Sequence, residues 1–394
     1  MSTAKKYTAC LALLVQVFLM HSAAVTAEVI EIRTPDEGLQ PRLVTDAAGG
    51  VHLLYFKKRL RAPSAREGNL YYREYLPAER RFGLPVQVSS TAYDLQTFAI
   101  ARASFAIDGE GRAHVMWYLP RAAQFFYSRS NPERSRFEAQ RSMVTQFIEG
   151  VDAAGDVAAV GNQVALLWGA GALSSEESRT VYARFSDDGG VSFGPELQVG
   201  NRDIGACACC SLAAEFDTRG QLAVAYRSAL EGVGRHMQLL TLHSSAASLA
   251  ESGLDLRGDY APLQTLQEWE LSSCPLSTND LLRDASGTIW ATFETEARVI
   301  RLQLGGAASA VREPASPTRQ KNPALAIGAQ GEIFTAWGEA ISHSKGGTLR
   351  AQLESSTGEL SAWQLSGEPD ERVLPNYSFP AAAALAGGDF LLVW

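Results

Sequence analysis

Seven copies of one short pattern run along this chain, and they constrain its fold more than any other feature. In each copy a turn containing glycine leads into an apolar strand that ends in an aromatic residue. The copies lie roughly 45–65 residues apart, which is the repeat length of propeller blades. The seven apolar strands are Val51–Phe56, Ala113–Tyr118, Val164–Trp168, Leu222–Tyr226, Ile289–Phe293, Ile333–Trp337 and Phe390–Trp394.

Each copy has the composition of a β-hairpin followed by a more polar outer strand. Glycine permits the positive φ that tight hairpin turns need, and Asp or Asn side chains bond to the turn backbone. The apolar runs are rich in aliphatic and aromatic residues, which favours strands. We therefore predict an all-β, seven-bladed β-propeller, with six blades and a separate hairpin as the alternative count. The seventh hairpin lacks a following outer strand, and we expect Val29–Arg33 to pair with it and close the ring.

The first 27 residues have the pattern of a signal peptide. Lys5 and Lys6 precede the apolar run Leu11–Met20, and Val25–Ala27 supplies the small residues of a cleavage site. We therefore predict a periplasmic or secreted protein whose single propeller domain covers residues 28–394. No later run approaches the ~20 apolar residues of a membrane span. The net charge of −8 argues against nucleic acid as a partner.

The cysteines downstream of the signal peptide are predicted to converge on one face of the ring. Cys207, Cys209 and Cys210 lie just before the inner strand of the fourth blade, and Cys274 lies just before that of the fifth. Such equivalent positions on adjacent blades meet beside the central channel. In an exported protein disulfides are favoured, for example one that links Cys274 to one of the other three cysteines. Thiolates also bind copper as Cu(I) or zinc as Zn(II), and a redox or free-thiol role is the third interpretation.

Other polar residues at or before inner strands are candidates for a ligand site at the same channel mouth. A small molecule, a glycan or a protein would suit such a site, although these residues could instead satisfy the backbone of their own loops. His52 and His114 occupy equivalent strand positions and are expected to be packed or hydrogen-bonded there. The candidate ligand-binding residues are Asn279, Asp280, Asn322, Asn376 and Tyr377.

One segment also matches a known repeat motif. Ser186–Phe193 (SDDGGVSF) fits the Asp-box pattern S-x-D-x-G-x-x-F at every fixed position, and so resembles the repeat of bacterial sialidases and other BNR-type propellers. The resemblance implies a structural hairpin turn between the two outer strands of a blade, not a catalytic site. In that turn Asp188 would bind backbone amides, Gly190 would be left-handed and the aromatic residue would pack into the blade. Degenerate copies occur at Ser130–Phe137 and Ser356–Trp363.

The catalytic residues that the sialidase resemblance implies do not carry over. In that family an Arg-Ile-Pro stretch opens the first blade, whereas here Leu39 stands where its arginine would be and Arg42 follows the proline. Spacing selects no tyrosine nucleophile or glutamate partner; the available residues are Tyr260, Tyr377, Glu268 and Glu270.

The cysteine pattern, by contrast, resembles that of uncharacterised secreted sialidase-like proteins. We therefore predict a propeller that binds a ligand or a metal ion at the channel mouth without sialidase activity. A glycoside hydrolase with a substituted active site is the alternative.

Overall fold

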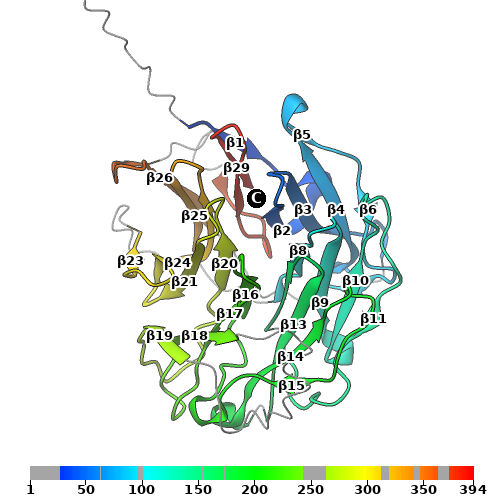
Figure 1. The fold of residues 1–394 in the computed structure, drawn as a ribbon, viewed down its shortest axis with the longest axis vertical. Helices are drawn as coiled ribbons and strands as arrows, with labels where there is room; N and C mark the ends of the chain where they lie inside the picture. The colour runs from blue at the N-terminus through cyan, green and yellow to red at the C-terminus, as the bar shows by residue number, and fades with distance from the viewer. Residues whose placement is uncertain are drawn as a thin grey trace, which may run out of the picture.

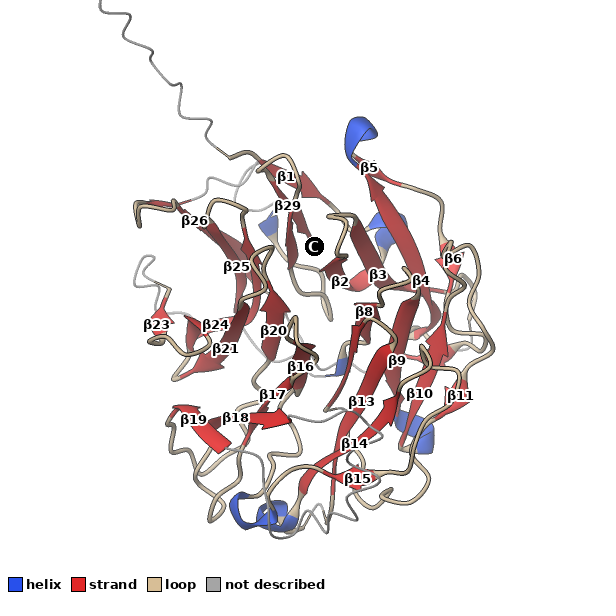
Figure 2. Ribbon diagram, viewed as in Figure 1, coloured by secondary structure: helices blue, strands red, loops and turns tan. Residues whose placement is uncertain are grey.

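Seven β-sheets surround a central axis in the computed structural model of this chain (Figure 1). The structure describes residues 27–62, 64–95, 101–152, 154–172, 174–242, 263–311, 319–340, 347–362 and 372–394. Each sheet is one blade, so the prediction of seven blades is confirmed and the alternative count of six is wrong. Figure 2 shows that strands form nearly all of the regular structure.

Every blade begins with an inner strand that is followed by its hairpin partner. The inner strands of blades one to seven are β2 (Leu39–Thr45), β8 (Ser104–Ile107), β12 (Gly155–Val160), β16 (Ala213–Phe216), β20 (Asn279–Arg283), β24 (Arg319–Ile327) and β28 (Ala381–Ala384). Their partners are β3 (Val51–Lys58), β9 (Ala113–Leu119), β13 (Gln163–Ala170), β17 (Leu222–Arg227), β21 (Ile289–Thr295), β25 (Ile333–Ala340) and β29 (Phe390–Val393).

The outer strands complete the blades. The third strands of blades one to six are β4 (Glu67–Leu76), β10 (Gln124–Arg129), β14 (Thr180–Ser186), β18 (Met237–Leu242), β22 (Arg298–Gln303) and β26 (Thr348–Glu354). The outermost strands are β5 (Arg81–Phe82), β6 (Val86–Gln87), β7 (Tyr93–Asp94), β11 (Arg141–Ser142), β15 (Leu197–Gln198), β19 (Leu263–Gln267), β23 (Ser309–Ala310) and β27 (Leu360–Ala362). The helices of the described residues are single 3-10 turns: η1 (Pro35–Glu37), η2 (Pro77–Glu79), η4 (Pro120–Ala122), η5 (Glu176–Ser178) and η6 (Arg202–Ile204).

The hydrophobic core lies between the blades. Each inner strand contacts the inner strands of both neighbouring blades, and β28 contacts β2, so the contacts form a closed circle. The buried apolar side chains divide into seven clusters, one for each pair of adjacent blades. Because both faces of a blade are covered in this way, its strands can be apolar on both sides, which explains uninterrupted runs such as Val164–Trp168.

The two ends of the described chain join in the seventh blade. Strand β1 (Val29–Ile32) pairs with β29 in the parallel direction, with Val29 beside Phe390 and Ile32 beside Val393. Figure 1 shows blue β1 against red β29. The pairing continues past the strand, since the Thr34 amide donates to the Trp394 carbonyl at 2.8 Å. The predicted closure of the ring by the N-terminal strand is confirmed.

The Asp-box segment forms the turn that its sequence implies. It connects β14 to β15, the two outer strands of blade three. Asp188 accepts hydrogen bonds from the Ser192 amide and the Ser192 and Ser186 hydroxyls, at 2.5–3.1 Å. Gly190 has a φ of 76°, and the Phe193 ring packs edge-on against Tyr127 of blade two at 5.2 Å. Asp188 is therefore a structural residue of a hairpin.

Several sequence predictions fall outside the described residues. These are the signal peptide, apart from Ala27 at its end, Tyr260, and Trp363 at the end of one degenerate Asp-box copy. Within the described part of the chain, no helix has the length and apolar character needed to cross a bilayer.

Candidate functional site

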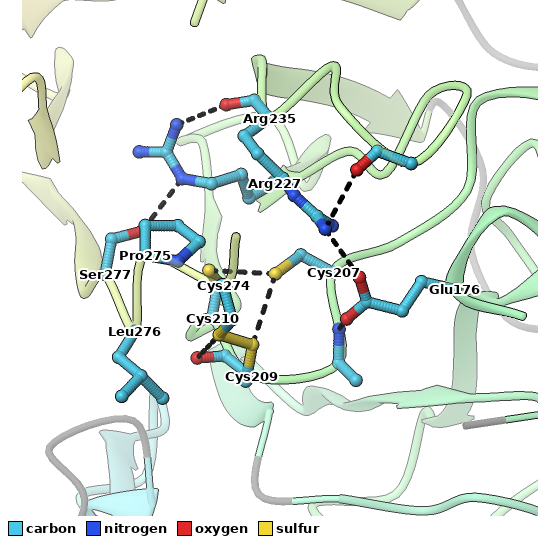
Figure 3. The surroundings of a disulfide bond; sticks show 12 residues. Glu176, Cys207, Cys209, Cys210, Arg227, Arg235, Cys274, Pro275, Leu276 and Ser277 are labelled. Atoms are coloured by element: carbon cyan, nitrogen blue, oxygen red, sulfur yellow. Dashed lines mark hydrogen bonds and ion pairs between the residues drawn. A yellow bond between two sulfur atoms is a disulfide. The ribbon is translucent and has the colours of Figure 1, made fainter. Parts of the chain in front are cut away.

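The four cysteines meet at one rim of the ring, as predicted. Cys207, Cys209 and Cys210 lie in the loop between η6 and β16, and Cys274 lies in the loop before β20. Both loops lead into inner strands, so they open on the same face beside the axis. We call these four residues the sulfur cluster (Figure 3).

One disulfide joins the two loops of the sulfur cluster. It links Cys209 to Cys274, with a Cα–Cα distance of 6.5 Å and 65 residues between the two positions. Cys274 is exposed and Cys209 is half-buried. This pairing agrees with the predicted bridge from Cys274 to the other three cysteines, and it means that Cys209 and Cys274 are not thiolates in this state.

The remaining two cysteines form a buried thiol pair. The Sγ atoms of Cys207 and Cys210 are 3.1 Å apart, and the side chains are 5% and 2% exposed. The Cys207 Sγ atom also lies 3.6 Å from the Cys209 Sγ atom. The sulfur atoms of all three residues lie within 4.8 Å of one another.

The environment of the thiol pair favours one thiolate. Burial alone would raise the pKa of Cys210, but hydrogen bonds from Cys207 and Ser277 and the positive charge of Arg227 outweigh it. The pKa of Cys210 falls from its usual 9.0 to about 6. The pKa of Cys207 is raised, because its thiol donates to Cys210 and is itself buried. A thiolate therefore forms more readily on Cys210 than on Cys207.

Two buried arginines flank the sulfur cluster. Arg227, at the end of β17, donates to the Ser277 hydroxyl at 2.8 Å and to the carbonyls of Arg235 and Glu294. Arg235 pairs with Glu176 at 2.7 Å, and Glu176 also accepts from the Ala208 amide of the cysteine loop. The Nε and Nη1 atoms of Arg235 are buried without a hydrogen-bond partner. Arg235 is thus paired with Glu176 but keeps two nitrogen atoms that lack an acceptor within the protein.

Hydrogen bonds hold the two cysteine loops together independently of the disulfide. The Ser211 amide donates to the Ser277 carbonyl at 3.0 Å. The Ser211 hydroxyl donates to Asn279 Oδ1 at 2.7 Å and accepts from the Asn279 amide at 2.6 Å. Lys321 of blade six reaches back to the carbonyls of Pro275 and Leu276. The loops therefore stay adjacent whether or not the disulfide is formed.

A second polar group occupies the axial channel. Arg42 on β2 pairs with Asp280 on β20 at 3.1 Å and with Asp156 on β12 at 3.5 Å. Arg102, just before β8, lies 3.7 Å from Asp280, and Glu215 on β16 lies 3.8 Å from Arg283. We call Arg42, Arg102, Asp156, Glu215 and Asp280 the axial charge cluster.

Burial shifts the ionisation of the axial charge cluster. It raises the pKa of Asp156 to about 6, even though Arg42 opposes the shift. Burial also raises the pKa of Glu215 from 4.5 to about 8, so this carboxyl keeps its proton at neutral pH. Burial, together with the nearby Arg42 charge, lowers the pKa of Arg102 to about 10. The channel therefore contains a neutral acid beside ionised groups.

A hollow at the channel mouth adjoins the axial charge cluster. It encloses about 220 Å³, including the open solvent at its mouth. Asn322 contributes a side-chain oxygen that is buried without a hydrogen-bond partner. A positive φ of 54° at Asn322, within a bulge of β24, gives this residue its position. The lining residues are Arg102, Thr278, Asn279, Asn322, Pro323 and Phe379.

The predicted ligand residues divide into two groups. Asn279 and Asn322 line this hollow, and Asp280 belongs to the axial charge cluster. Asn376 is exposed and does not line the hollow. Tyr377 packs against the apolar core between blades one and two and is not among the residues that line the hollow.

Sequence reasoning missed most of the axial charge cluster. Arg102, Asp156 and Glu215 were not among the candidates, and Arg42 was considered only as a displaced sialidase arginine. In the structure a bulge between Leu39 and Arg42, with Gln40 at a φ of 54°, precedes Arg42. Arg42 pairs with Asp156 of blade three and Asp280 of blade five. A charged residue within an otherwise apolar inner strand, such as Asp156 in Gly155–Val160 (GDVAAV), is the sequence signal that could have identified this cluster.

Comparison with known proteins identifies no family for this chain. No protein-family model matches the chain, and no curated protein matches it. A solved structure of a protein of unknown function from Dyadobacter fermentans shares 10% identity at a TM-score of 0.49, covering 79% of this chain and 93% of its own. The α-L-arabinanase of Penicillium chrysogenum shares 9% identity at a TM-score of 0.46, covering 84% and 98%.

A third solved structure is similar to this chain to a comparable degree. Virginiamycin B lyase from Staphylococcus aureus, in a catalytically inactive form, shares 10% identity at a TM-score of 0.43, covering 85% of this chain and 87% of its own. The sialidase resemblance of the sequence is not confirmed by any of these three structures.

Proposed function

We propose that this protein is an exported binding propeller that holds a soft metal ion, Cu(I) or Zn(II), in the sulfur cluster. The observation that carries this proposal is the placement of three sulfur atoms of one short loop within 4.8 Å of one another. Thiolates are the ligands that Cu(I) prefers, and Zn(II) binds them tetrahedrally. Export rests on the leader pattern of residues 1–27.

The spacing of the sulfurs suits an ion after a small movement. With Zn–S bonds of about 2.3 Å and tetrahedral angles, two ligand sulfurs lie about 3.8 Å apart. Cys207 and Cys209 are already 3.6 Å apart, while Cys207 and Cys210 must separate from 3.1 Å. Reduction of the Cys209–Cys274 disulfide frees the third and fourth thiolates. Ion binding therefore belongs to the reduced protein.

The charges around the sulfur cluster support an anionic metal–thiolate complex. Three or four thiolates around one Cu(I) or Zn(II) ion leave an excess of negative charge. Arg227 and Arg235 are buried beside the loop, and two nitrogen atoms of Arg235 lack partners. Buried charge is stable only when it is balanced or hydrogen-bonded. The complex would place negative charge beside Arg227, whose hydrogen-bond acceptors are the Ser277 hydroxyl and two backbone carbonyls, and beside the two unpartnered nitrogens of Arg235.

A metal competition experiment tests the proposal. The reduced mature protein is titrated anaerobically with Cu(I) held by a chromophoric chelator, and with Zn(II) in a parallel series. We expect about one ion per chain, and its loss in the double variant Cys207→Ser/Cys210→Ser. The control is Met143→Leu, which removes a buried sulfur outside the cysteine loops, in the core between blades two and three, at nearly constant volume. Failure of the reduced wild-type protein to compete for either ion would overturn the proposal.

A glycoside hydrolase with a substituted active site is the second candidate, and the axial charge cluster favours it. Hydrolysis of a glycoside uses two carboxyl groups of different ionisation, one of which donates a proton. The raised pKa of Glu215, about 8, makes it a proton donor, and Asp156 has a pKa of about 6. Asp156 is only 1% exposed and is bound to Arg42, however, which makes it a poor base. We therefore rank binding first.

Hydrolysis has a direct test. A panel of aryl glycosides is incubated with the wild-type protein and with Glu215→Gln. Turnover by the wild-type protein that falls at least about 100-fold in the variant would support the enzyme, in keeping with the usual contribution of a general acid. Turnover that is equal in both proteins, or absent from both, would remove this candidate.

A further inference from the structure

The sulfur cluster contains two redox pairs in different states and at different depths. Cys207 and Cys210 are thiols and are buried, whereas the disulfide joins half-buried Cys209 to exposed Cys274. Cys207 lies between them, with its Sγ atom 3.1 Å from Cys210 and 3.6 Å from Cys209. A thiol that contacts both a second thiol and a disulfide sulfur is placed for exchange in either direction.

We infer that the sulfur cluster is a dithiol–disulfide relay, in which Cys207 passes a disulfide between the exposed rim and the buried pair. This activity goes beyond metal binding and needs no metal. It uses the same four residues in the state that the structure shows. The external reaction partner is a thiol or a disulfide, belonging to a protein or a small molecule, that reaches Cys274 at the surface.

The internal exchange takes place in two balanced steps. In the first, the Cys207 thiol gives its proton to Cys210, Cys207 Sγ bonds to Cys209 Sγ, and the Cys209–Cys274 bond breaks to leave Cys274 as a thiolate. In the second, Cys210 Sγ bonds to Cys207 Sγ, the Cys207–Cys209 bond breaks, and Cys209 gains the proton that Cys210 loses. No net oxidation occurs: the buried dithiol becomes a disulfide, and the exposed disulfide becomes a dithiol.

The sequence spacing suits the second disulfide. Cys207 and Cys210 stand in a Cys-x-x-Cys arrangement, which is the spacing of dithiol–disulfide couples in thiol oxidoreductases. Both exchange steps start from sulfur contacts that already exist within one four-residue loop. The exposed dithiol that results, Cys209 with Cys274, can then transfer two electrons to a partner disulfide and return to the oxidised form.

The surrounding hydrogen bonds allow the rim disulfide to open without loss of the site. Ser211 remains bonded to the Ser277 carbonyl and to Asn279. Lys321 remains bonded to the carbonyls of Pro275 and Leu276, next to Cys274. After the first step Cys274 therefore stays beside the loop from which it was released. A purely structural bridge would duplicate a connection that these bonds already make.

Disulfide mapping of the metal-free protein tests the relay. The wild-type protein, with chelator present throughout, is equilibrated in a thiol–disulfide buffer, quenched in acid and alkylated, and its linked cysteines are identified by mass spectrometry. We expect two populations, one linked Cys209–Cys274 and the other Cys207–Cys210. Finding only the Cys209–Cys274 linkage at every buffer potential, with Cys207 and Cys210 always alkylated after denaturation, would overturn the inference. This measurement needs no variant.

Two variants separate the steps. Cys210→Ser permits the first step only, so we expect a Cys207–Cys209 linkage together with an alkylated Cys274. Cys207→Ser blocks both steps, so only the Cys209–Cys274 linkage is expected. Oxidation of the fully reduced proteins by glutathione disulfide gives the rate of external exchange at the rim. We expect formation of the Cys207–Cys210 bond in the wild-type protein to follow Cys274 oxidation; its formation in Cys274→Ser at an unchanged rate would contradict the relay.

The two proposals fail separately. Exchange in metal-free protein that shows no affinity for Cu(I) or Zn(II) would leave the relay and remove the metal proposal. Tight metal binding by a protein with a single fixed disulfide linkage would do the reverse.

Discussion

The neutral carboxyl in the channel leads to a quantitative prediction. Burial raises the pKa of Glu215 to about 8, whereas in the unfolded chain it is 4.5. Between these values the unfolded chain has lost this proton while the folded protein keeps it, so the free energy of unfolding falls as pH rises. From pH 6.5 to 8 the decrease contributed by Glu215 is roughly 1.5–2 kcal/mol. Its side chain is 23% exposed, so solvent screens it only in part.

Glu215→Gln tests this prediction, because the amide has a similar shape and no charge in this range. The free energy of unfolding is measured by urea denaturation of both proteins at several pH values from 6.5 to 8. Groups that do not interact with Glu215 contribute equally to both proteins and cancel in the difference, whereas Asp156 and Asp280, whose charges raise the pKa of Glu215, cancel only in part. We expect the wild-type protein to lose about 1.5–2 kcal/mol relative to the variant across this interval.

A second carboxylate variant serves as the control for this experiment. Glu359→Gln removes a carboxylate from an exposed turn and controls for the change in net charge. Parallel curves for the wild-type protein and Glu215→Gln, within about 0.5 kcal/mol, would show that the channel does not hold Glu215 neutral. That result would also remove the proton donor on which the hydrolase candidate depends.

Two further perturbations test the blades themselves. Asp188→Ala removes the acceptor of two hydrogen bonds from Ser192 and should lower the free energy of unfolding by about 1 kcal/mol in urea denaturation, with any ligand binding unchanged. His114→Phe leaves buried Asp108 and Tyr127 without their partner and should cost about 3 kcal/mol. Burial lowers the pKa of His114 in the folded protein below the 6.5 of the unfolded chain. The wild-type protein therefore loses stability as the pH falls from 6.5 to the pKa of the folded state. The variant should lack this part of the decline in acid melting curves.

The architecture was predictable because it depends on local chemistry that repeats. Each blade needs a turn with a permissive residue and an apolar strand, and both are visible in one sequence. The predicted strand Leu222–Tyr226, for example, is β17 with one additional residue. The position of the cysteines followed from the same periodicity, since Cys207 and Cys274 each precede an inner strand.

The chemistry inside the channel was less predictable because it depends on groups from different blades. Asp156 and Asp280 come from blades three and five and form ion pairs with Arg42 of blade one. No local sequence pattern indicates that segments so far apart in the chain are in contact. The bulge that precedes Arg42 also interrupts the simple alternation on which the sequence argument relied. The choice of disulfide partner is of the same kind: sequence places Cys207, Cys209 and Cys210 together, but only the three-dimensional arrangement brings Cys209 to Cys274.

The parallel pairing of β1 with β29, which we call the seam of the ring, makes the order of folding depend on the order of synthesis. Glu28 and Asp389, which flank these strands and are hydrogen-bonded to each other, are 361 residues apart in sequence. Bringing two such distant points together carries an entropic penalty of about 5 kcal/mol. A chain that emerges from its N-terminus must hold β1 without a partner until the last hairpin exists. The first strand made is therefore among the last to be paired, and this seam is where an unfinished ring would remain open to a foreign strand.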